Sequence, residues 1–572
     1  MTERNITLDN WVFYGLLAAI VGVYVAGIGA NSIWTTHESY YAVAVREMLE
    51  SGDWLTITFN GDLRFNKPPL TYWLMAASAS IFGLKEWALR LPILLCSLGT
   101  LFVTYRLGVT LFSKEVGRWA LLLMAVSLQF AWLKHYASPE IPLTFFFTLT
   151  MYGFFRGLQD QQREYLMLAF ASLSLTMLVK GWPYFLVVYA VLGTFLLLHH
   201  RFCLSKIKNV VPLGWFLWGS LVSLLIGLSW LGLMYLRYEE ELLEVLHFET
   251  SQRTVRSNQT GFWKQWFFYP EAIVWSFFPG SLVLYYALVY YLKKGLTVLQ
   301  KVALPIAWLG VMLLGFTLAQ GKLPAYILQA HPAMALLCAY FIVQSQQNKK
   351  VQRINAWLWG LTSFVAIVSS IGLVVAFHLS EVWYLVIGLL VGVAIWQYIK
   401  YYSLFAPTLA VTSTVVALAI LFISLYPSLE QYRPYRAIQQ VIVNHQISEA
   451  VPMVVEERFI HNMPFYAERK VLRDRQYSRA DIVDMEKKEP VLGLVKTGHA
   501  LPAGYQVLWQ GWLYRKGSES HGFRFIVHCW QAYRGNYQHF QEYQLVYQPP
   551  SSQKNLSVVL SLSDKMRKTS TQ

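Results

Sequence analysis

Long apolar runs separated by short polar segments occupy the first three quarters of the chain. Because a membrane-spanning helix needs about 20 mainly apolar residues, each run is a candidate span. The pattern predicts about thirteen helices, at 11–31, 88–112, 117–133, 141–157, 165–179, 182–198, 211–236, 267–292, 302–319, 326–344, 356–377, 381–398 and 404–426. The first run has no small-residue cleavage site after it, so we expect a retained helix rather than a signal peptide.

The pattern changes after Pro427, where charged and polar residues rise and the long apolar runs stop. Short strands are predicted at 451–455, 491–495 and 506–512, and a helix is predicted at 479–487. We therefore expect a transmembrane domain over 1–427, a small external α/β domain over 428–550 and a Ser-rich disordered tail over 551–572. The external domain could bind the acceptor or serve as a lid.

Basic residues fall in alternate loops between the predicted spans. With a cytoplasmic N-terminus, every short inner loop is basic, through Lys114, Arg118, Arg156, Arg163, Arg201, Lys206, Lys208, Lys293, Lys294, Lys301, Lys349, Lys350, Arg353 and Lys400. This is the asymmetry that the positive-inside rule requires. An odd number of spans then places the C-terminal domain outside, so we expect a multi-pass protein of the inner (plasma) membrane with a periplasmic C-terminal domain.

Composition agrees with a membrane protein. Hydrophobic residues make up 55% and charged residues only 14% of the 572 positions, where a soluble domain carries about 25% charged residues. The net charge of +15 is accounted for by the inner loops, so no nucleic-acid partner is expected. The four cysteines form no CxxC pair, and we expect neither a disulfide framework nor a metal site.

Two predicted outer loops are long. Loop 32–87 contains a stretch at 40–50 that reads as an amphipathic helix, with Tyr41, Val45 and Met48 on one side. Loop 237–266 is charged and is expected to be irregular.

Several basic residues lie on the outer face, where the positive-inside rule predicts few. They are Lys67, Lys134, Lys180, Arg253, Arg256, Lys264 and Lys322. Such side chains often snorkel to lipid headgroups, and we expect this of Lys134 and Lys264. Lys67 and Lys322 stand beside prolines, which fix the local backbone, so we expect a function for both.

Two carboxylates are placed on the same face. Glu38 follows the first helix, and Glu140 opens the fourth. A carboxylate at a helix N-terminus also stabilises the helix dipole, which is the structural alternative for Glu140. Together with the outer lysines, the two carboxylates suggest a general base facing an anion site.

Five motifs in order resemble one known family. They are HESYYAVAVREMLESGDWLTITFNGDLRFNKPPLTYW (37–73), SPEIPLTFFFTL (138–149), LVKGWP (178–183), HFETSQR (247–253) and KLPAYILQAHPAMALL (322–337). The sequence resembles the glycosyltransferases of families 39 and 83, which include the protein O-mannosyltransferases and the lipid A aminoarabinose transferases. The resemblance spans about residues 11–345 and implies an all-α polytopic membrane protein with the GT-C fold.

The resemblance implies transfer of a sugar from a polyprenyl-phosphate donor to an acceptor hydroxyl or phosphate on the outer face, with inversion. Candidate ligands of the donor phosphate are Lys67, Arg253, Lys322 and Tyr326. Further candidate substrate contacts are Tyr41, Lys180 and His247.

The identity of the base stays open. The family's first motif usually reads Asp-Glu, where this sequence has His37-Glu38, so Glu38, His37 and Glu140 are all candidates. The aminoarabinose transferases carry Glu before the lysine of the KPP motif, and here Asn66 replaces it. We therefore expect no cofactor, and a divalent metal has no support in the sequence.

The expected partners are a polyprenyl-phosphate sugar, a lipid, glycan or protein acceptor, and membrane lipids, with the chain itself a monomer. One alternative is a transporter or flippase of lipid-linked glycans, although no internal repeat or midplane charge favours it. A second alternative is a ligase that joins a larger lipid-linked glycan to an acceptor.

Overall fold

A computed structural model describes residues 8–255, 262–319, 321–400, 405–472, 478–488, 490–498, 501, 505–515 and 522–547. The predicted disordered tail, 551–572, lies outside these residues. Internal contacts divide the chain into two compact units. The first unit combines Met1–Ile28 with Arg64–Ser424, and the second combines Gly29–Leu63 with Leu425–Gln572.

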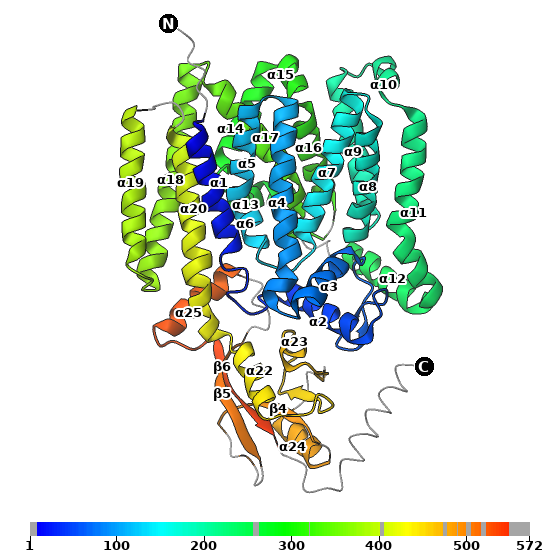
Figure 1. The fold of residues 1–572 in the computed structure, drawn as a ribbon, viewed down its shortest axis with the longest axis vertical. Helices are drawn as coiled ribbons and strands as arrows, with labels where there is room; N and C mark the ends of the chain where they lie inside the picture. Colours follow the sequence, from blue (N-terminus) through cyan, green and yellow to red (C-terminus); the bar gives the residue numbers. More distant parts are fainter. Residues whose placement is uncertain are drawn as a thin grey trace. The chain divides into compact units, whose positions relative to one another are not determined.

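The described part of the first unit is helical, and its long helices lie side by side (Figure 1). The helices are α1 (Asn10–Val25), α3 (Leu70–Phe82), α4 (Glu86–Leu111), α5 (Lys114–Val126), α6 (Leu128–Leu133), α7 (Glu140–Gln159), α8 (Arg163–Lys180), α9 (Pro183–His199), α10 (Leu204–Val210), α11 (Leu213–Arg237), α12 (Glu239–Val255), α13 (Phe262–Ser276), α14 (Ser281–Lys294), α15 (Leu296–Lys301), α16 (Ala303–Leu318), the 3-10 helix η2 (Pro324–Ala330), α17 (His331–Ser345), α18 (Lys349–Ala376), α19 (Val382–Lys400) and α20 (Phe405–Ala419). A π-helical turn, η3 (Ile420–Leu425), follows α20.

Every predicted span coincides with helical structure. Within the described residues, five continuous helices are long and apolar enough to cross a membrane by themselves. Two predicted spans, 117–133 and 267–292, are each divided into two helices, so the total number of crossings stays a prediction.

A backbone hydrogen bond links the two breaks. At the first break the Leu128 amide donates to the Phe278 carbonyl, which belongs to the second break, at 3.0 Å. The Ser127 hydroxyl lies 3.0 Å from Nδ1 of His331, the first residue of α17. Backbone groups freed at membrane depth need such partners, because lipid supplies none. Three helix ends are therefore joined inside the first unit.

The prediction of an irregular loop at 237–266 was wrong. Residues Glu239–Val255 form α12, and its first turn carries Glu239, Glu240 and Glu241. Carboxylates in this position stabilise the positive end of the helix dipole. The many charged residues of this segment, which predict a loop, instead stabilise the N-terminus of a helix.

The second unit is a small α/β structure. It comprises α2 (Thr36–Ser51), β1 (Thr58–Phe59), β2 (Asp62–Leu63), α21 (Tyr426–Leu429), η4 (Glu430–Tyr432), α22 (Tyr435–Asn444), β3 (Met453–Val455), α23 (Met463–Ala467), α24 (Arg479–Lys488), β4 (Leu492–Lys496), β5 (Gln506–Tyr514), α25 (Gly522–Tyr533) and β6 (Phe540–Tyr547). The sheet has the order β3-β4-β6-β5, with β3 and β4 parallel and the other pairs antiparallel.

The three strands and the helix predicted after Pro427 are confirmed as β3, β4, β5 and α24. One face of the sheet packs against α24 through Val454, Val495, Val546 and Ile482. The sequence analysis missed β6, α22, α23 and α25.

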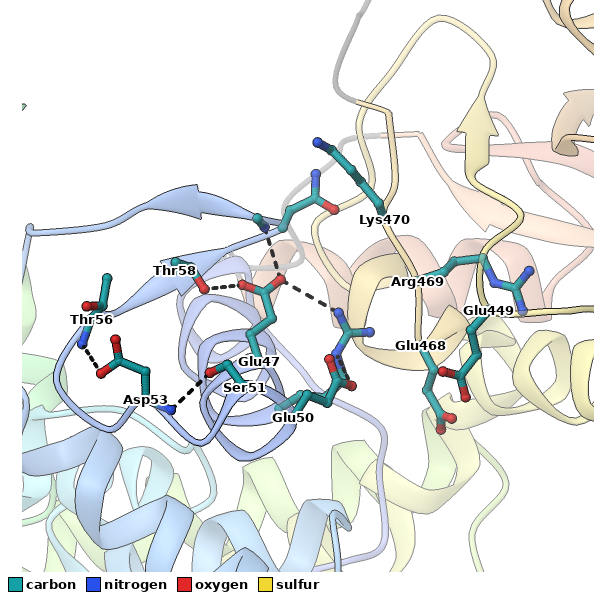
Figure 2. Close-up of a pocket in the computed structure, with 13 residues that line it drawn as sticks. Glu47, Glu50, Ser51, Asp53, Thr56, Thr58, Glu449, Glu468, Arg469 and Lys470 are labelled. Carbon is teal, nitrogen blue, oxygen red and sulfur yellow. Dashed lines mark hydrogen bonds and ion pairs between the residues drawn. The ribbon is translucent and has the colours of Figure 1, made fainter. Parts of the chain in front are cut away.

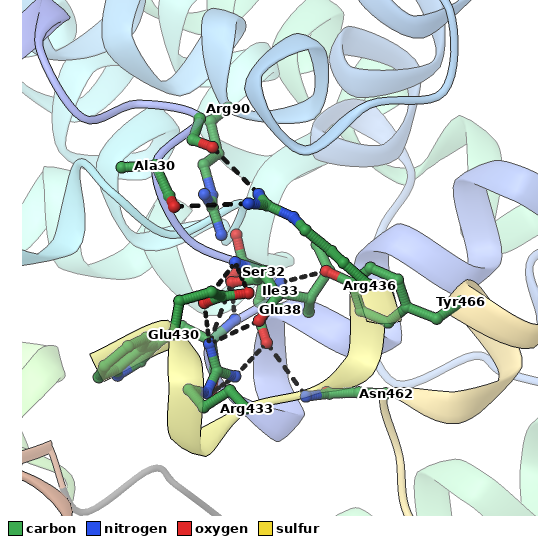
Figure 3. Close-up of polar contacts among 12 residues, drawn as sticks. Ala30, Ser32, Ile33, Glu38, Arg90, Glu430, Arg433, Arg436, Asn462 and Tyr466 are labelled. Carbon is green, nitrogen blue, oxygen red and sulfur yellow. Dashed lines mark hydrogen bonds and ion pairs between the residues drawn. The ribbon is translucent and has the colours of Figure 1, made fainter. Parts of the chain in front are cut away.

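A buried arginine joins the two sequence segments of the second unit (Figure 3). Arg433 is 1% exposed, and its guanidinium donates to the carbonyls of Ser32, Ile33 and Trp34. It also lies 4.5 Å from the ring centroid of Trp34, a cation–π contact. One side chain thus fixes the strand-like segment that leads into α2.

Candidate functional site

Glu140 and Lys180 form an ion pair in the first unit. Glu140 is the first residue of α7 and Lys180 is the last residue of α8. Lys180 Nζ lies 3.0 Å from Glu140 Oε1, and both side chains are about one-tenth exposed. The pair is thus a largely buried charged pair held at two helix ends.

Glycines let the two helices pack closely at the end opposite this pair. A Cβ atom on Gly153 would lie 2.8 Å from the Ala169 nitrogen and 2.9 Å from the Tyr165 carbonyl oxygen. A Cβ atom on Gly157 would lie 2.6 Å from Leu166. Small residues of this kind let membrane helices approach closely. The antiparallel pair α7–α8 therefore places the start of one helix beside the end of the other.

Tyrosines surround the ion pair. Lys180 Nζ lies 5.5 Å from the ring centroid of Tyr326, which belongs to η2. Tyr184, near the start of α9, is buried. The ring of Phe316 lies 6.1 Å from that of Tyr269 and 5.4 Å from that of Tyr326. These hydroxyls are suited to hydrogen-bond a sugar or a phosphate oxygen. Tyr184 and Tyr269 were not among the predicted site residues, since nothing distinguishes them from the other 33 tyrosines in the sequence.

Lys322 caps the end of α16. Its ammonium donates to the carbonyls of Thr317 at 2.5 Å and Phe316 at 3.3 Å, and it lies 5.7 Å from the ring centroid of Tyr269. Carbonyls in the last turn of a helix have no partner within the helix, so a lysine there stabilises it. Partial burial lowers the pKa of Lys322. The predicted lysine is thus held in place and shares Tyr269 with the surroundings of Glu140.

Lys67 is held beside its prolines, as predicted from its motif. Its Nζ donates to the Asn66 carbonyl at 2.8 Å, and Pro69 forms the N-cap of α3. The preceding Phe65 packs against Trp230 and Tyr238 at the end of α11, with ring centroids 6.4 Å and 5.6 Å away. The lysine is half-buried in the first unit.

Two further predicted residues lie on α12. His247 is exposed, and the side chain of Arg253 lies outside the described part of the structure. Neither residue is joined to the Glu140–Lys180 pair by a described contact, so their roles stay predictions.

Glu38 has a structural role in the second unit. It is fully buried, and its Oε2 accepts a hydrogen bond from the Trp34 amide at 2.6 Å. Its own amide donates to the Thr35 hydroxyl at 3.0 Å. Thr35 is the N-cap of α2, so the two residues form an arrangement close to a capping box. The carboxylate of Glu38 is used to start α2.

His37 and Tyr41 differ in their exposure. His37, on the first turn of α2, is exposed and packs edge-on against Tyr40 at 6.4 Å. Tyr41 is 1% exposed and belongs to the interior of the second unit. His37 is therefore the more accessible of the two to a substrate.

The prediction that Lys134 snorkels to lipid headgroups was wrong. Lys134 is 2% exposed, and its ammonium donates to the Tyr24 carbonyl at 3.0 Å and lies 2.6 Å from His135 Nε2. It also lies 4.7 Å and 4.8 Å from the ring centroids of Tyr24 and Phe422. Aromatic faces and a carbonyl replace water around the charge. The side chain of Lys264, of which the same was expected, lies outside the described residues.

A polar cleft of about 590 Å³ lies at the C-terminal end of α2, within the second unit (Figure 2). Its walls are tied together, because Glu47 accepts from the Thr58 hydroxyl and Asn60 exchanges two hydrogen bonds with the backbone of Val471. The charged residues lining it are Arg46, Glu47, Glu50, Asp53, Glu449, Glu468, Arg469 and Lys470. Carboxylates outnumber basic groups, so this cleft is unsuited to a phosphate.

Four of the predicted residues are thus gathered in the first unit: Glu140 pairs with Lys180, Lys180 faces Tyr326, and Lys322 shares Tyr269 with them. They come from the ends of α7, α8 and α16 and from η2. The spacing along the sequence gave no such grouping, because it depends on how the helices pack.

The chain is similar in sequence to one described protein family and to several individual proteins. Residues 66–231 match the family described as dolichyl-phosphate-mannose-protein mannosyltransferase. A protein of Aquifex aeolicus without an assigned function is 31% identical over 488 residues, which cover 85% of this chain and 91% of that protein. The undecaprenyl phosphate-alpha-4-amino-4-deoxy-L-arabinose arabinosyl transferase 1 of Pseudomonas fluorescens is 25% identical over 370 residues, and the alignment covers 63% of each chain.

A solved structure shares the fold. ArnT from Cupriavidus metallidurans, in its crystal structure bound to undecaprenyl phosphate, has a TM-score of 0.70 and 18% sequence identity. The match covers 84% of this chain and 92% of that one. The predicted fold, a helical membrane protein with a small α/β region near the C-terminus, is confirmed by this likeness.

Proposed function

Because the chain belongs to the GT-C membrane glycosyltransferases of the mannosyltransferase and aminoarabinose-transferase type, we propose that it transfers a sugar from a polyprenyl phosphate to an acceptor hydroxyl. The acceptor is a lipid, a glycan or a protein. The basic inner loops support a multi-pass protein of the inner membrane that acts on the periplasmic side. The observation that carries the assignment of the site is the Glu140–Lys180 pair, with its tyrosines, in the first unit.

The donor phosphate is the leaving group, and negative charge grows on it as the bond to the anomeric carbon breaks. Cations fixed in advance lower the barrier to such a step. Lys180 is held by its ion pair with Glu140, Lys322 by hydrogen bonds to the end of α16, and Lys67 by its prolines. We assign Lys322 and Lys67 to the phosphate, with Tyr326 as a hydroxyl donor, while Lys180 pairs with Glu140.

The acceptor hydroxyl needs a base, since a neutral alcohol is a weak nucleophile. In the proposed step its oxygen attacks the anomeric carbon from the face opposite the phosphate, and its proton passes to a carboxylate. The sugar–phosphate C–O bond breaks with inversion. We favour Glu140 as the base, because its ion pair holds it as a carboxylate, whereas the Glu38 carboxylate caps α2.

The test uses purified full-length protein with a labelled polyprenyl-phosphate sugar and an extract of membrane lipids and envelope proteins. We expect Glu140→Gln to lower the rate of transfer by about 10²- to 10⁴-fold, the usual contribution of a general base. Asp160→Asn is the matched control, because Asp160 lies at the other end of α7 and is also ion-paired, with Arg156 at 2.7 Å.

Two further variants decide between the bases. Glu38→Gln and His37→Ala should each keep the rate within a few-fold of the unmodified protein. A large loss of transfer rate in His37→Ala, together with a normal transfer rate in Glu140→Gln, would identify His37 as the base. Absence of transfer from every donor in a panel of polyprenyl-phosphate sugars would refute the proposed activity itself.

A further inference from the structure

A second cavity lies at the far end of the first unit's helices from the Glu140–Lys180 pair. Its volume is about 800 Å³, within the range of about 300–1,000 Å³ common for small-molecule sites. It is lined by the C-terminal ends of α4, α7, α9 and α17 and by the start of α16. Figure 1 shows α10 and α15 at this same end of the helices.

The inner part of the cavity is apolar and aromatic. The rings of Phe112 and Tyr340 stack with centroids 4.5 Å apart, and those of Phe155 and Phe195 meet edge-on at 5.9 Å. Leu304, at the start of α16, is 2% exposed and closes the floor. Such a surface is suited to hydrocarbon and offers nothing to a small soluble anion.

The rim is basic. His199, His200 and Lys301 line it together with Gln300, and no carboxylate belongs to its described lining. Gln300 holds the rim in place, because its amide donates to the His199 carbonyl at 3.2 Å and its oxygen accepts from Arg201 at 3.0 Å. Two separate segments, the end of α9 and α15, are thereby fixed at one polar edge.

We propose that this cavity binds an anionic phospholipid of the surrounding membrane. The headgroup phosphate lies at the basic rim, and the upper part of an acyl chain lies against the aromatic residues. Anionic lipids gather at the basic cytoplasmic side of membrane proteins, which is the side that the inner loops assign to this end. A neutral lipid would leave the Lys301 ammonium unmatched, and a free phosphate would leave the aromatic surface bare.

The site is separate from the proposed active site. None of Glu140, Lys180, Lys322, Tyr326 or Lys67 lines the cavity. The inference therefore does not rest on the proposed function, and a lipid bound here would act on the packing of the helix ends.

The experiment is native mass spectrometry of the full chain in neutral detergent, titrated with phosphatidylglycerol or with phosphatidylcholine of the same acyl chains. We expect one phosphatidylglycerol to be retained at least tenfold more tightly than phosphatidylcholine. The double variant His199→Gln/Lys301→Gln should lower that affinity at least about fivefold, since the Lys301 charge near a lipid phosphate contributes on the order of 1 kcal/mol. Lys293→Gln/Lys294→Gln, at the end of α14 and outside the cavity, is the matched control.

A second variant covers the chance that the rim variant fails to fold. Leu304→Trp places an indole in the buried lining of the cavity and should weaken phosphatidylglycerol binding while His199 and Lys301 remain. Equal retention of the two lipids, or an equal loss in the control variant, would overturn the proposal. Displacement of phosphatidylglycerol by a stoichiometric amount of undecaprenyl phosphate would also overturn it, because the occupant would then be the carrier lipid.

Discussion

Lys180 Nζ lies 3.0 Å from Glu140 Oε1, and this pair joins the end of α8 to the start of α7. Each charge also matches its helix, since a carboxylate favours the N-terminus of a helix and an ammonium favours the C-terminus. The pair therefore has a structural value that is independent of any chemistry. A sequence can supply both residues, but only close packing of the two helices brings them together.

Close packing of α7 and α8 gives the first prediction. We expect Gly153→Ala to displace α7 from α8, because the new Cβ would lie 2.8 Å from the Ala169 nitrogen. Overpacking of this kind costs about 1–3 kcal/mol. The thermal unfolding temperature in detergent should fall, and the rate of transfer should fall less, since Gly153 lies 13 residues along α7 from Glu140.

Gly193→Ala, in α9, is the matched control. A Cβ there meets nothing within 4 Å, and alanine favours a helix over glycine by up to about 1 kcal/mol. This variant should be as stable as the unmodified protein or slightly more so. If Gly153→Ala behaved like Gly193→Ala in both measurements, the helices would not be held by the glycine contact.

The capping role of Glu38 gives the second prediction. Thr35→Ala and Glu38→Gln should each lower the unfolding temperature, and loss of the threonine cap should lower the free energy of unfolding by about 1 kcal/mol. Transfer should persist in both, because neither side chain is the favoured base. Thr36→Ala, one residue later, is the control. Loss of transfer in Glu38→Gln with an unchanged unfolding temperature would instead identify Glu38 as part of the chemistry.

The sequence predicted the long helices of the first unit well because each of those shows as an apolar run. It also predicted β3, β4, β5 and α24, where alternation and composition are clear. It could not reveal the break at Ser127, because that break is compensated by Phe278 and His331, which are distant in sequence. Hydrophobicity reports that a segment is buried in lipid or protein, but not which backbone groups find partners.

Side-chain environments were harder to predict than elements. Lys134 and Lys322 look alike in sequence, as basic residues after apolar runs, yet one is enclosed by aromatic rings and the other caps α16. Glu38 sits in the motif that most resembles a catalytic one, but its carboxylate accepts a backbone hydrogen bond. Local sequence identifies the residue type that chemistry requires, while the neighbours that decide its role come from elsewhere in the chain.

The buried guanidinium of Arg433 gives the third prediction. Arg433→Lys should lower the free energy of unfolding by about 3 kcal/mol, because a single ammonium nitrogen cannot take both positions of the guanidinium nitrogens that bind Ser32 and, separately, Ile33 and Trp34. Limited proteolysis should then cut within 29–35 at lower protease concentration. Arg524→Lys, an exposed arginine on α25, should change neither. Equal behaviour of the two variants would show that the guanidinium does not hold this segment.

The Lys134–His135 pair predicts how stability depends on pH. His135 is 1% exposed, and burial, the Lys134 ammonium and Arg90 together lower its pKa well below the usual value of 6.5. Burial and Arg90 likewise lower the pKa of Lys134. The folded protein thus keeps His135 neutral at a pH where the unfolded chain protonates it.

The sign follows from linkage, since stability rises with pH wherever the unfolded state binds more protons. As the pH falls below 6.5, the unfolded chain binds a proton on His135, whereas the folded chain does not. The unfolding free energy should therefore fall by up to about 1.4 kcal/mol per pH unit between pH 6.5 and 5. In His135→Gln this contribution should vanish and the slope of unfolding temperature against pH should flatten, whereas His445→Gln, an exposed histidine, should keep the original slope. An unchanged slope in His135→Gln would mean that the acid sensitivity arises at other groups.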